Sequence, residues 1–212
     1  MILIYSLFHF LSYSLLHLIY EKSLSMELYY IFYCSMIIPI LTYGLYNIQD
    51  IEFPYQFSGV NHYGMNILYN VNTSFMTFLI NDIIANIVYK YPLRKEIFLH
   101  HFVFITLTLI GYITQKYYIL VMLIYAEVST IFLSLRNIKE SNILNIMFAI
   151  TFFIFRVCFY SYQIPSILFN LFKTDINLYI YSYIAIVLVV GLFLQYFWFY
   201  IIVKKALKKK TE

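Results

Sequence analysis

Long apolar runs alternate with short polar segments along the whole chain, and each run is about as long as a membrane-spanning helix. A transmembrane helix needs ~20 mostly apolar residues, and about seven runs meet that length. The pattern therefore predicts an all-α fold, a polytopic transmembrane helix bundle in which residues 1–212 form a single domain. The predicted spans are 2–20, 28–46, 64–88, 97–114, 117–135, 143–168 and 178–203.

Details of the spans and their connections refine this prediction. Pro39 and Pro165 fall inside spans, where a membrane helix tolerates a kink. The longest connection runs from Asn47 to Tyr63, and a re-entrant or interfacial piece within it remains an alternative. The first span has no basic segment before it and no small-residue cleavage site, so we expect a retained helix rather than a signal peptide.

Composition indicates that lipid is the solvent of this chain. Hydrophobic residues make up 63% of it and charged residues only 11%, whereas a soluble domain has roughly a quarter of its residues charged. Both cysteines, Cys34 and Cys158, lie inside apolar spans, which argues against a disulfide framework or a zinc site. We therefore expect an integral membrane protein with no nucleic-acid partner.

Lysine and arginine fall mostly on one side of the predicted membrane. If the C-terminal tail faces the cytosol, only Lys116 and Lys173 lie on the opposite side, and Arg156 lies inside a span. Because positive charge concentrates in cytoplasmic loops, we expect a lumenal or external N-terminus and a cytosolic C-terminus. The residues on the cytosolic side are Lys22, Lys90, Arg94, Lys95, Arg136, Lys139, Lys204, Lys205, Lys208, Lys209 and Lys210.

The basic tail, residues 204–212, ends in Lys209-Lys210-Thr211-Glu212. This spacing resembles a dilysine retrieval signal of the endoplasmic reticulum, which acts on a cytosolic tail in a eukaryotic cell. An equally good interpretation is a basic flank that binds anionic lipid head groups. The expected localisation is a multi-pass membrane protein, in the endoplasmic reticulum if the first interpretation holds.

Five ionisable residues fall at membrane depth, where such side chains are costly and therefore candidates for function. The rise of a helix, ~1.5 Å per residue, places Asp82 about 9 Å from the cytosolic end of its span. By the same measure His100 and His101 lie about 5 to 6 Å deep, and Glu127 lies about 12 Å deep. Arg156 lies about 20 Å deep, near the midplane. The first four therefore share the cytosolic leaflet.

This set of residues suits acyl or proton transfer. A neutral histidine acts as general base or nucleophile, and a carboxylate on its other ring nitrogen fixes the tautomer and stabilises the imidazolium. Asp82 and Glu127 are the candidate orienting carboxylates. Adjacent helix residues point ~100° apart, so His100 and His101 cannot have the same role, and we favour His101 as the catalytic residue.

Structural interpretations of the same residues remain open. Histidines near a helix end also occur at the membrane interface, and Arg156 suits a structural partner of a buried carboxylate. Asp82 and Asn81 suit hydrogen bonds between helices. Two histidines and two acids also suit a metal ion, but adjacent histidines lack the i, i+4 spacing of a helical chelate, so we predict no metal.

Hydroxyl groups close to Glu127 are candidates for substrate binding. Thr130 lies three residues further on and shares its helix face, so this hydroxyl and that of Ser129 suit contact with the carboxylate or a substrate. Alternatively, both hydroxyls bond back to their own helix. The remaining histidines are interpreted as interfacial residues without a role: His9, His17 and His62.

Several of these segments, taken in order, resemble the TLC-domain family. This family includes the ceramide synthases and the translocating-chain-associated membrane protein. The resemblance covers roughly residues 75 to 165, and the multi-span layout extends it to most of the chain. The aromatic-rich helix with an intramembrane acid is Phe78–Asp82, and the double histidine is in Leu99–His101. The Glu-x-Ser-Thr segment is Glu127–Thr130, followed by Arg136, and the penultimate helix is Phe152–Arg156 with Pro165.

The resemblance carries expectations about chemistry. Ceramide synthases have His-Asp-x-x-Asp where this chain has Ala126-Glu127-Val128-Ser129-Thr130, so the chain is more similar to the TLC-domain-containing branch. The resemblance implies a membrane-lipid acyltransferase with acyl-CoA or a phospholipid as donor, no tightly bound cofactor, and membrane lipids as partners. Whether the protein forms an oligomer remains open.

Three functions compete at this stage. The first is acyl transfer by His100, His101, Glu127 and Asp82, supported by Arg156, Thr130 and Ser129. The second is a non-enzymatic protein that binds lipid, sets membrane composition or assists trafficking, with the same polar residues joining helices. The third is a channel or transporter, which is weaker because no inverted repeat or pair of broken helices is visible.

Overall fold

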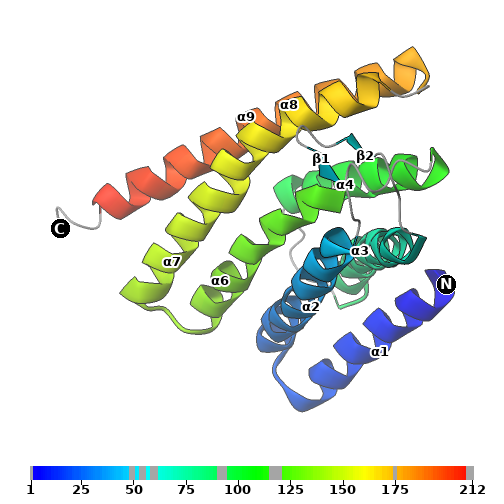
Figure 1. The fold of residues 1–212 in the computed structure, drawn as a ribbon. Helices are drawn as coiled ribbons and strands as arrows, with labels where there is room; N and C mark the ends of the chain where they lie inside the picture. The colour runs from blue at the N-terminus through cyan, green and yellow to red at the C-terminus, as the bar shows by residue number, and fades with distance from the viewer. Residues whose placement is uncertain are drawn as a thin grey trace. The chain divides into compact units, whose positions relative to one another are not determined.

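The computed structural model describes residues 2–47, 51–52, 56–57, 62–89, 95–114, 121–173 and 176–208. Within these residues it contains seven continuous helical segments, which follow the predicted spans in order (Figure 1). The first four are α1 (Ile2–Ile19), α2 (Lys22–Tyr46), α3 (His62–Val88) and α4 (Lys95–Ile113). The prediction of an all-helical architecture is confirmed for the chain as described.

The second half of the chain departs from regular α-helix at two places. A 3-10 stretch, Val121–Ala126, continues into α6 (Glu127–Ile138). Next, α7 (Asn142–Phe152), a π-helical turn (Phe153–Cys158) and α8 (Phe159–Phe172) form one unbroken helix, and α9 (Leu178–Lys208) runs back alongside it (Figure 1). The 3-10 stretch ends directly before Glu127, and the π-helical turn contains Arg156, two residues singled out in the sequence.

Among the residues that the structure describes, four helices are long and apolar enough to cross a membrane, and two shorter apolar helices accompany them. The four are Ser23–Tyr46, Gly64–Val88, Asn142–Phe172 and Leu178–Lys205, and the shorter ones are Leu3–Ile19 and Phe98–Ile113. The span predicted over 117–135 is described only from Val121, as the 3-10 stretch and α6. A multi-pass membrane protein is thus confirmed, while its orientation stays a prediction.

The surface of these helices has the character of a lipid-facing surface. On α9, large apolar side chains such as Ile186 (65% exposed) and Phe193 (69%) point outward. Patches of this kind are too apolar to remain in water, so the hydrocarbon of a bilayer is the environment that fits them. As predicted, Pro39 and Pro165 lie inside helices, α2 and α8.

The long connection after α2 contains two very short strands. β1 (Ile51–Glu52) pairs antiparallel with β2 (Gln56–Phe57), with Ile51 opposite Phe57 and Glu52 opposite Gln56. The described part of this connection is therefore a small strand pair, which the sequence pattern did not predict.

The helices form two compact units. Unit 1 comprises residues 1–29 and 36–124, and unit 2 comprises residues 30–35 and 125–212. In unit 1, α3 packs against α1 and α4 around fully buried apolar side chains, including Leu68, Phe75 and Leu79. In unit 2, Phe148, Phe152 and Val157 form a core against Phe132, Leu133, Trp198, Phe199 and Ile202.

Candidate functional site

The most distinctive feature of unit 1 is a buried contact between an acid and a histidine. His101 Nδ1 on α4 lies 3.0 Å from Asp82 Oδ2 on α3. Both side chains are nearly closed to the outside, since His101 is 8% exposed and Asp82 is 3% exposed. A buried carboxylate at one ring nitrogen holds the imidazole in one orientation and one tautomer.

His100 has a different environment, although it precedes His101 directly. Its ring lies 4.7 Å from the Phe104 ring and 5.7 Å from the His101 ring, measured between centroids. The ~100° step between helix neighbours explains why only one of the two faces Asp82. The structure therefore gives the Asp82 contact to His101, the residue favoured from the sequence.

Three other polar side chains of α3 donate to carbonyl groups of the same helix. Thr73 donates to the Tyr69 carbonyl at 2.9 Å, and Asn81 donates to the Thr77 carbonyl at 2.8 Å. Asn86 donates to the Asp82 carbonyl at 2.7 Å. Asn81 thus bonds along its own helix rather than between helices, whereas the carboxylate of Asp82 reaches another element.

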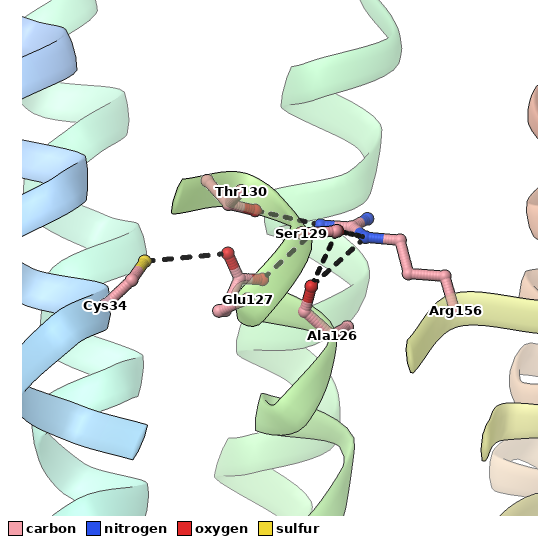
Figure 2. Close-up of polar contacts among 6 residues, drawn as sticks. All are labelled: Cys34, Ala126, Glu127, Ser129, Thr130 and Arg156. Atoms are coloured by element: carbon pink, nitrogen blue, oxygen red, sulfur yellow. Dashed lines mark hydrogen bonds and ion pairs between the residues drawn. The ribbon is translucent and has the colours of Figure 1, made fainter. Parts of the chain in front are cut away.

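In unit 2, Arg156 extends from the π-helical turn to α6 (Figure 2). Its Nε donates to Ser129 Oγ at 2.6 Å and to the Ala126 carbonyl at 3.3 Å, and its Nη2 donates to Thr130 Oγ1 at 3.0 Å. Nη2 also lies 3.9 Å from Glu127 Oε1. Because π turns are rare and often occur at functional sites, an arginine carried by one merits a functional interpretation.

Glu127 lies between two very different neighbours. One carboxylate oxygen faces Arg156, and the other, Oε2, lies 4.0 Å from Cys34 Sγ on α2 (Figure 2). Glu127 is 5% exposed and Cys34 is completely buried. The charge of Glu127 is therefore compensated inside the protein by the guanidinium, as a buried carboxylate requires.

Both hydroxyls after Glu127 accept from Arg156, a contact that neither predicted alternative included, and Ser129 also bonds back to its own helix. Ser129 Oγ donates back to the Ala126 carbonyl at 2.8 Å, within its own helix, and it also accepts from Arg156. Thr130 Oγ1 accepts from Arg156. These contacts fit Arg156 as the structural partner of a buried carboxylate, with the two hydroxyls holding its guanidinium in place.

The predicted site residues thus form two groups, each within one unit. Asp82 and His101 meet in unit 1, and the second group lies in unit 2. That Glu127 orients a histidine, and that four of the residues share one leaflet, stay predictions. The members of the second group are Glu127, Ser129, Thr130 and Arg156.

His9 is buried among the helices of unit 1, and its place at the membrane interface stays a prediction. His9 is 1% exposed, and its ring nitrogens contact the Tyr29 hydroxyl at 2.8 Å and Ser74 Oγ at 3.4 Å. The available signal was its position near the middle of the first span, where a polar residue is costly. His17 stacks on Tyr13 at 6.2 Å between centroids, and the side chain of His62 lies outside the described part.

Two further sequence predictions concern a metal ion and the basic tail. Among the side chains that the structure describes, no three of the types His, Cys, Asp and Glu gather closely enough to hold a metal ion. The dilysine-like residues, Lys209–Glu212, lie outside the described residues.

Comparison with known proteins identifies the family. The sequence model of the TLC domain matches residues 4–204, a region that includes most of α1 and α9, all of α2 to α8, and both polar groups. A search of curated proteins finds no match to the sequence. Because the match covers nearly the whole chain, this multi-pass membrane protein belongs to the TLC-domain family.

Proposed function

We propose that the protein transfers acyl groups between membrane lipids, or from acyl-CoA to a membrane lipid, at the Asp82–His101 pair. The observation that carries the proposal is the 3.0 Å contact between two buried groups from different helices. A buried carboxylate and a histidine cost stability unless they are paired, and this pair is the arrangement that general-base chemistry requires.

The geometry suggests how His101 acts. With Nδ1 facing Asp82, Nε2 is left to accept a proton from the hydroxyl or amine of the acceptor. The acceptor oxygen or nitrogen then bonds to the acyl carbonyl carbon, the bond from that carbon to the donor sulfur or oxygen breaks, and His101 returns the proton to the leaving group. Alternatively, Nε2 itself attacks the carbonyl carbon and expels the donor sulfur or oxygen, and the acceptor then bonds to that carbon and displaces the imidazole.

The residues of unit 2 have a supporting part in this proposal. Arg156 and Glu127 neutralise one another inside the protein, and Ser129 and Thr130 fix the guanidinium. We assign this group a supporting role within unit 2, where Arg156 balances the charge of Glu127.

The proposal also includes the orientation of the protein in the membrane, its branch of the TLC-domain family and its location in the cell. The C-terminus faces the cytosol, the reaction takes place in the cytosolic leaflet, and the protein resides in the endoplasmic reticulum. The bias of positive charge and the Lys209–Glu212 sequence support these assignments. The Glu127–Thr130 segment supports the TLC-domain-containing branch rather than the ceramide synthases.

The test compares two adjacent histidines. Membranes containing wild type, His101→Ala or His100→Ala, at matched amounts of folded protein, receive labelled acyl-CoA or labelled phospholipid, and the label is followed into each lipid class. We expect His101→Ala to lose ~10²-fold or more of the transfer, because general-base catalysis contributes that much, while His100→Ala retains most of it. Transfer that survives in both variants contradicts the proposal.

A second candidate function is lipid binding or trafficking without catalysis. It is favoured by the hydrogen bonds that Arg156, in the π-helical turn, donates to residues at the start of α6. These bonds join two helices whether or not a reaction takes place. Under this alternative, substitutions at Asp82 or His101 reduce folded protein and cellular effect in the same proportion. A variant that stays folded but is inactive favours the enzyme.

A further inference from the structure

Basic side chains gather at one end of unit 2, where two helices end and a third begins. Arg136 and Lys139 lie at the end of α6, and Lys204 and Lys205 lie near the end of α9 (Figure 1). The α7 helix begins at Asn142, directly after the turn that follows α6. We call the four basic side chains the basic rim.

A shared aromatic core holds the members of the basic rim at one level of unit 2. The Arg136 guanidinium carbon lies 4.9 Å from the centre of the Phe148 ring on α7. Further along the same helix, Phe152 stacks on Phe199 of α9 at 6.4 Å between centroids. Because α9 runs back alongside α7, Lys204 lies nearly level with Phe148, each about one turn from the stacked pair. The basic ends of α6 and α9 are therefore close together.

Two candidate membrane spans also have their boundaries at this end of unit 2. One span begins at Asn142 and the other ends at Lys205. Just inside these boundaries, large apolar side chains face outward, since Ile143 is 72% exposed and Tyr200 is 61% exposed. Such side chains contact lipid acyl chains, while long basic side chains beside them extend to the head-group region. The basic rim therefore lies where lipid phosphates are found.

The charge of the basic rim is not balanced within the described part of the protein. No carboxylate there forms an ion pair with any of the four side chains. Glu140 is the single acidic residue in the turn between α6 and α7. A cluster of cations above a lipid-facing apolar surface complements a molecule with an anionic head group above acyl chains. An arginine among them suits phosphate in particular, because the guanidinium donates two parallel hydrogen bonds to it.

We propose that the basic rim binds the phosphate of an anionic phospholipid whose acyl chains lie along α7 and α9. Arg136, which is held over Phe148, contacts the phosphate, and the lysines supply further positive charge. The site involves binding only, so it does not depend on the proposed acyl transfer. It also does not depend on which leaflet this end of unit 2 faces.

Lipid retention by the full-length protein tests the site. Purified protein in detergent is titrated with phosphatidylglycerol or with phosphatidylcholine of the same acyl chains, and bound lipid is counted by native mass spectrometry. Arg136→Gln and Lys205→Gln each remove one charge from the basic rim. Lys173→Gln is the matched control, because that ammonium also lies beside an aromatic ring, 4.2 Å from the centre of Phe169, but directly after α8.

We expect wild type to retain phosphatidylglycerol in preference to phosphatidylcholine. Each rim variant should bind phosphatidylglycerol ~5-fold more weakly, which is the factor that one cation near a membrane surface contributes. Lys173→Gln should bind as wild type does, and Lys205→Gln decides the matter if Arg136→Gln fails to fold. Equal retention of the two lipids, equal weakening in the control, or displacement of the bound lipid by inorganic phosphate overturns the proposal.

Discussion

At the scale of single residues, one step along a helix separates two identical side chains into different environments. His101 faces Asp82, whereas His100 packs against the ring of Phe104. The difference follows from helix geometry and from which neighbour each side chain meets. Chemistry assigned to a double histidine therefore belongs to one position of the pair.

Substitution of Asp82 tests the role of the carboxylate in the pair. Asp82→Asn keeps the shape of the side chain but replaces an acceptor by an amide that favours the other imidazole tautomer. We expect acyl transfer to fall by ~10²-fold or more, with little change in folded protein. The measurement is the labelled-lipid assay together with size-exclusion chromatography in detergent. Asn81→Ala is the control, and a wild-type rate in Asp82→Asn would remove the carboxylate from the mechanism.

The pair in unit 2 gives a prediction about stability. Arg156→Met leaves the charge of Glu127 buried without its guanidinium, so we expect a loss of about 3 kcal/mol in the free energy of unfolding. Glu127→Gln in the same chain removes the orphaned charge and restores part of the loss. Thermal unfolding in nanodiscs measures both. If the double variant is as unstable as the sum of the single variants, the two side chains do not interact.

At the scale of elements, close approach and irregular helix geometry place the polar groups. The π-helical turn before α8 changes the rotation of the helix at Arg156, and the guanidinium reaches the start of α6 from it. In unit 1, α2 approaches α3 closely at Gly44, where an added Cβ would lie 2.7 Å from Ile67 Cγ2 and 2.9 Å from Leu68 Cδ2. The absence of a side chain at Gly44 allows this approach.

Two glycine substitutions test the contact between α2 and α3. Gly44→Ala forces Ile67 and Leu68 to shift, and we expect a loss of about 1–3 kcal/mol in the free energy of unfolding from overpacking. Gly191→Ala is the matched control, because an added Cβ there meets nothing within 4 Å. Thermal unfolding of both variants in the same nanodiscs is the measurement. Equal stability of the two would show that α2 and α3 are not closely packed at Gly44.

At the scale of the whole molecule, two compact units each enclose their own polar group in a largely apolar chain. Unit 1 holds Asp82 and His101, and unit 2 holds Glu127 and Arg156. Because buried ionisable groups destabilise a membrane helix unless they are paired, each unit contains the partner that its acid requires. Orientation in the membrane is a separate property of the molecule, decided by the loops and the tail.

The orientation prediction is tested with tags at the two ends of the chain. In sealed eukaryotic membranes we expect a C-terminal epitope to be digested from the cytosolic side and an added N-terminal glycosylation site to be modified, because most basic residues flank the cytosolic side. The double substitution Lys209→Ser and Lys210→Ser should release the protein from the endoplasmic reticulum. The double substitution Lys204→Ser and Lys205→Ser serves as the control. A protected C-terminal epitope would reverse the assigned topology.

The sequence by itself determined the properties that depend on local pattern. Apolar runs of membrane-spanning length predicted the helices, and low charge predicted a multi-pass membrane protein, because bilayer thickness and the cost of burying backbone groups act on each segment separately. The order of the polar motifs also indicated the TLC-domain family, which the match over residues 4–204 confirms. These properties follow from each segment alone or from the order of segments along the chain.

Tertiary structure decided which polar groups meet. It placed His101 rather than His100 on Asp82, and it linked Arg156 to the hydroxyls beside Glu127. It also showed His9 within a buried hydrogen-bonded chain. Such contacts depend on the rotation of one helix against another and on irregular turns. Residues that are 19 to 65 positions apart along the chain meet only through packing, which hydrophobic periodicity does not encode.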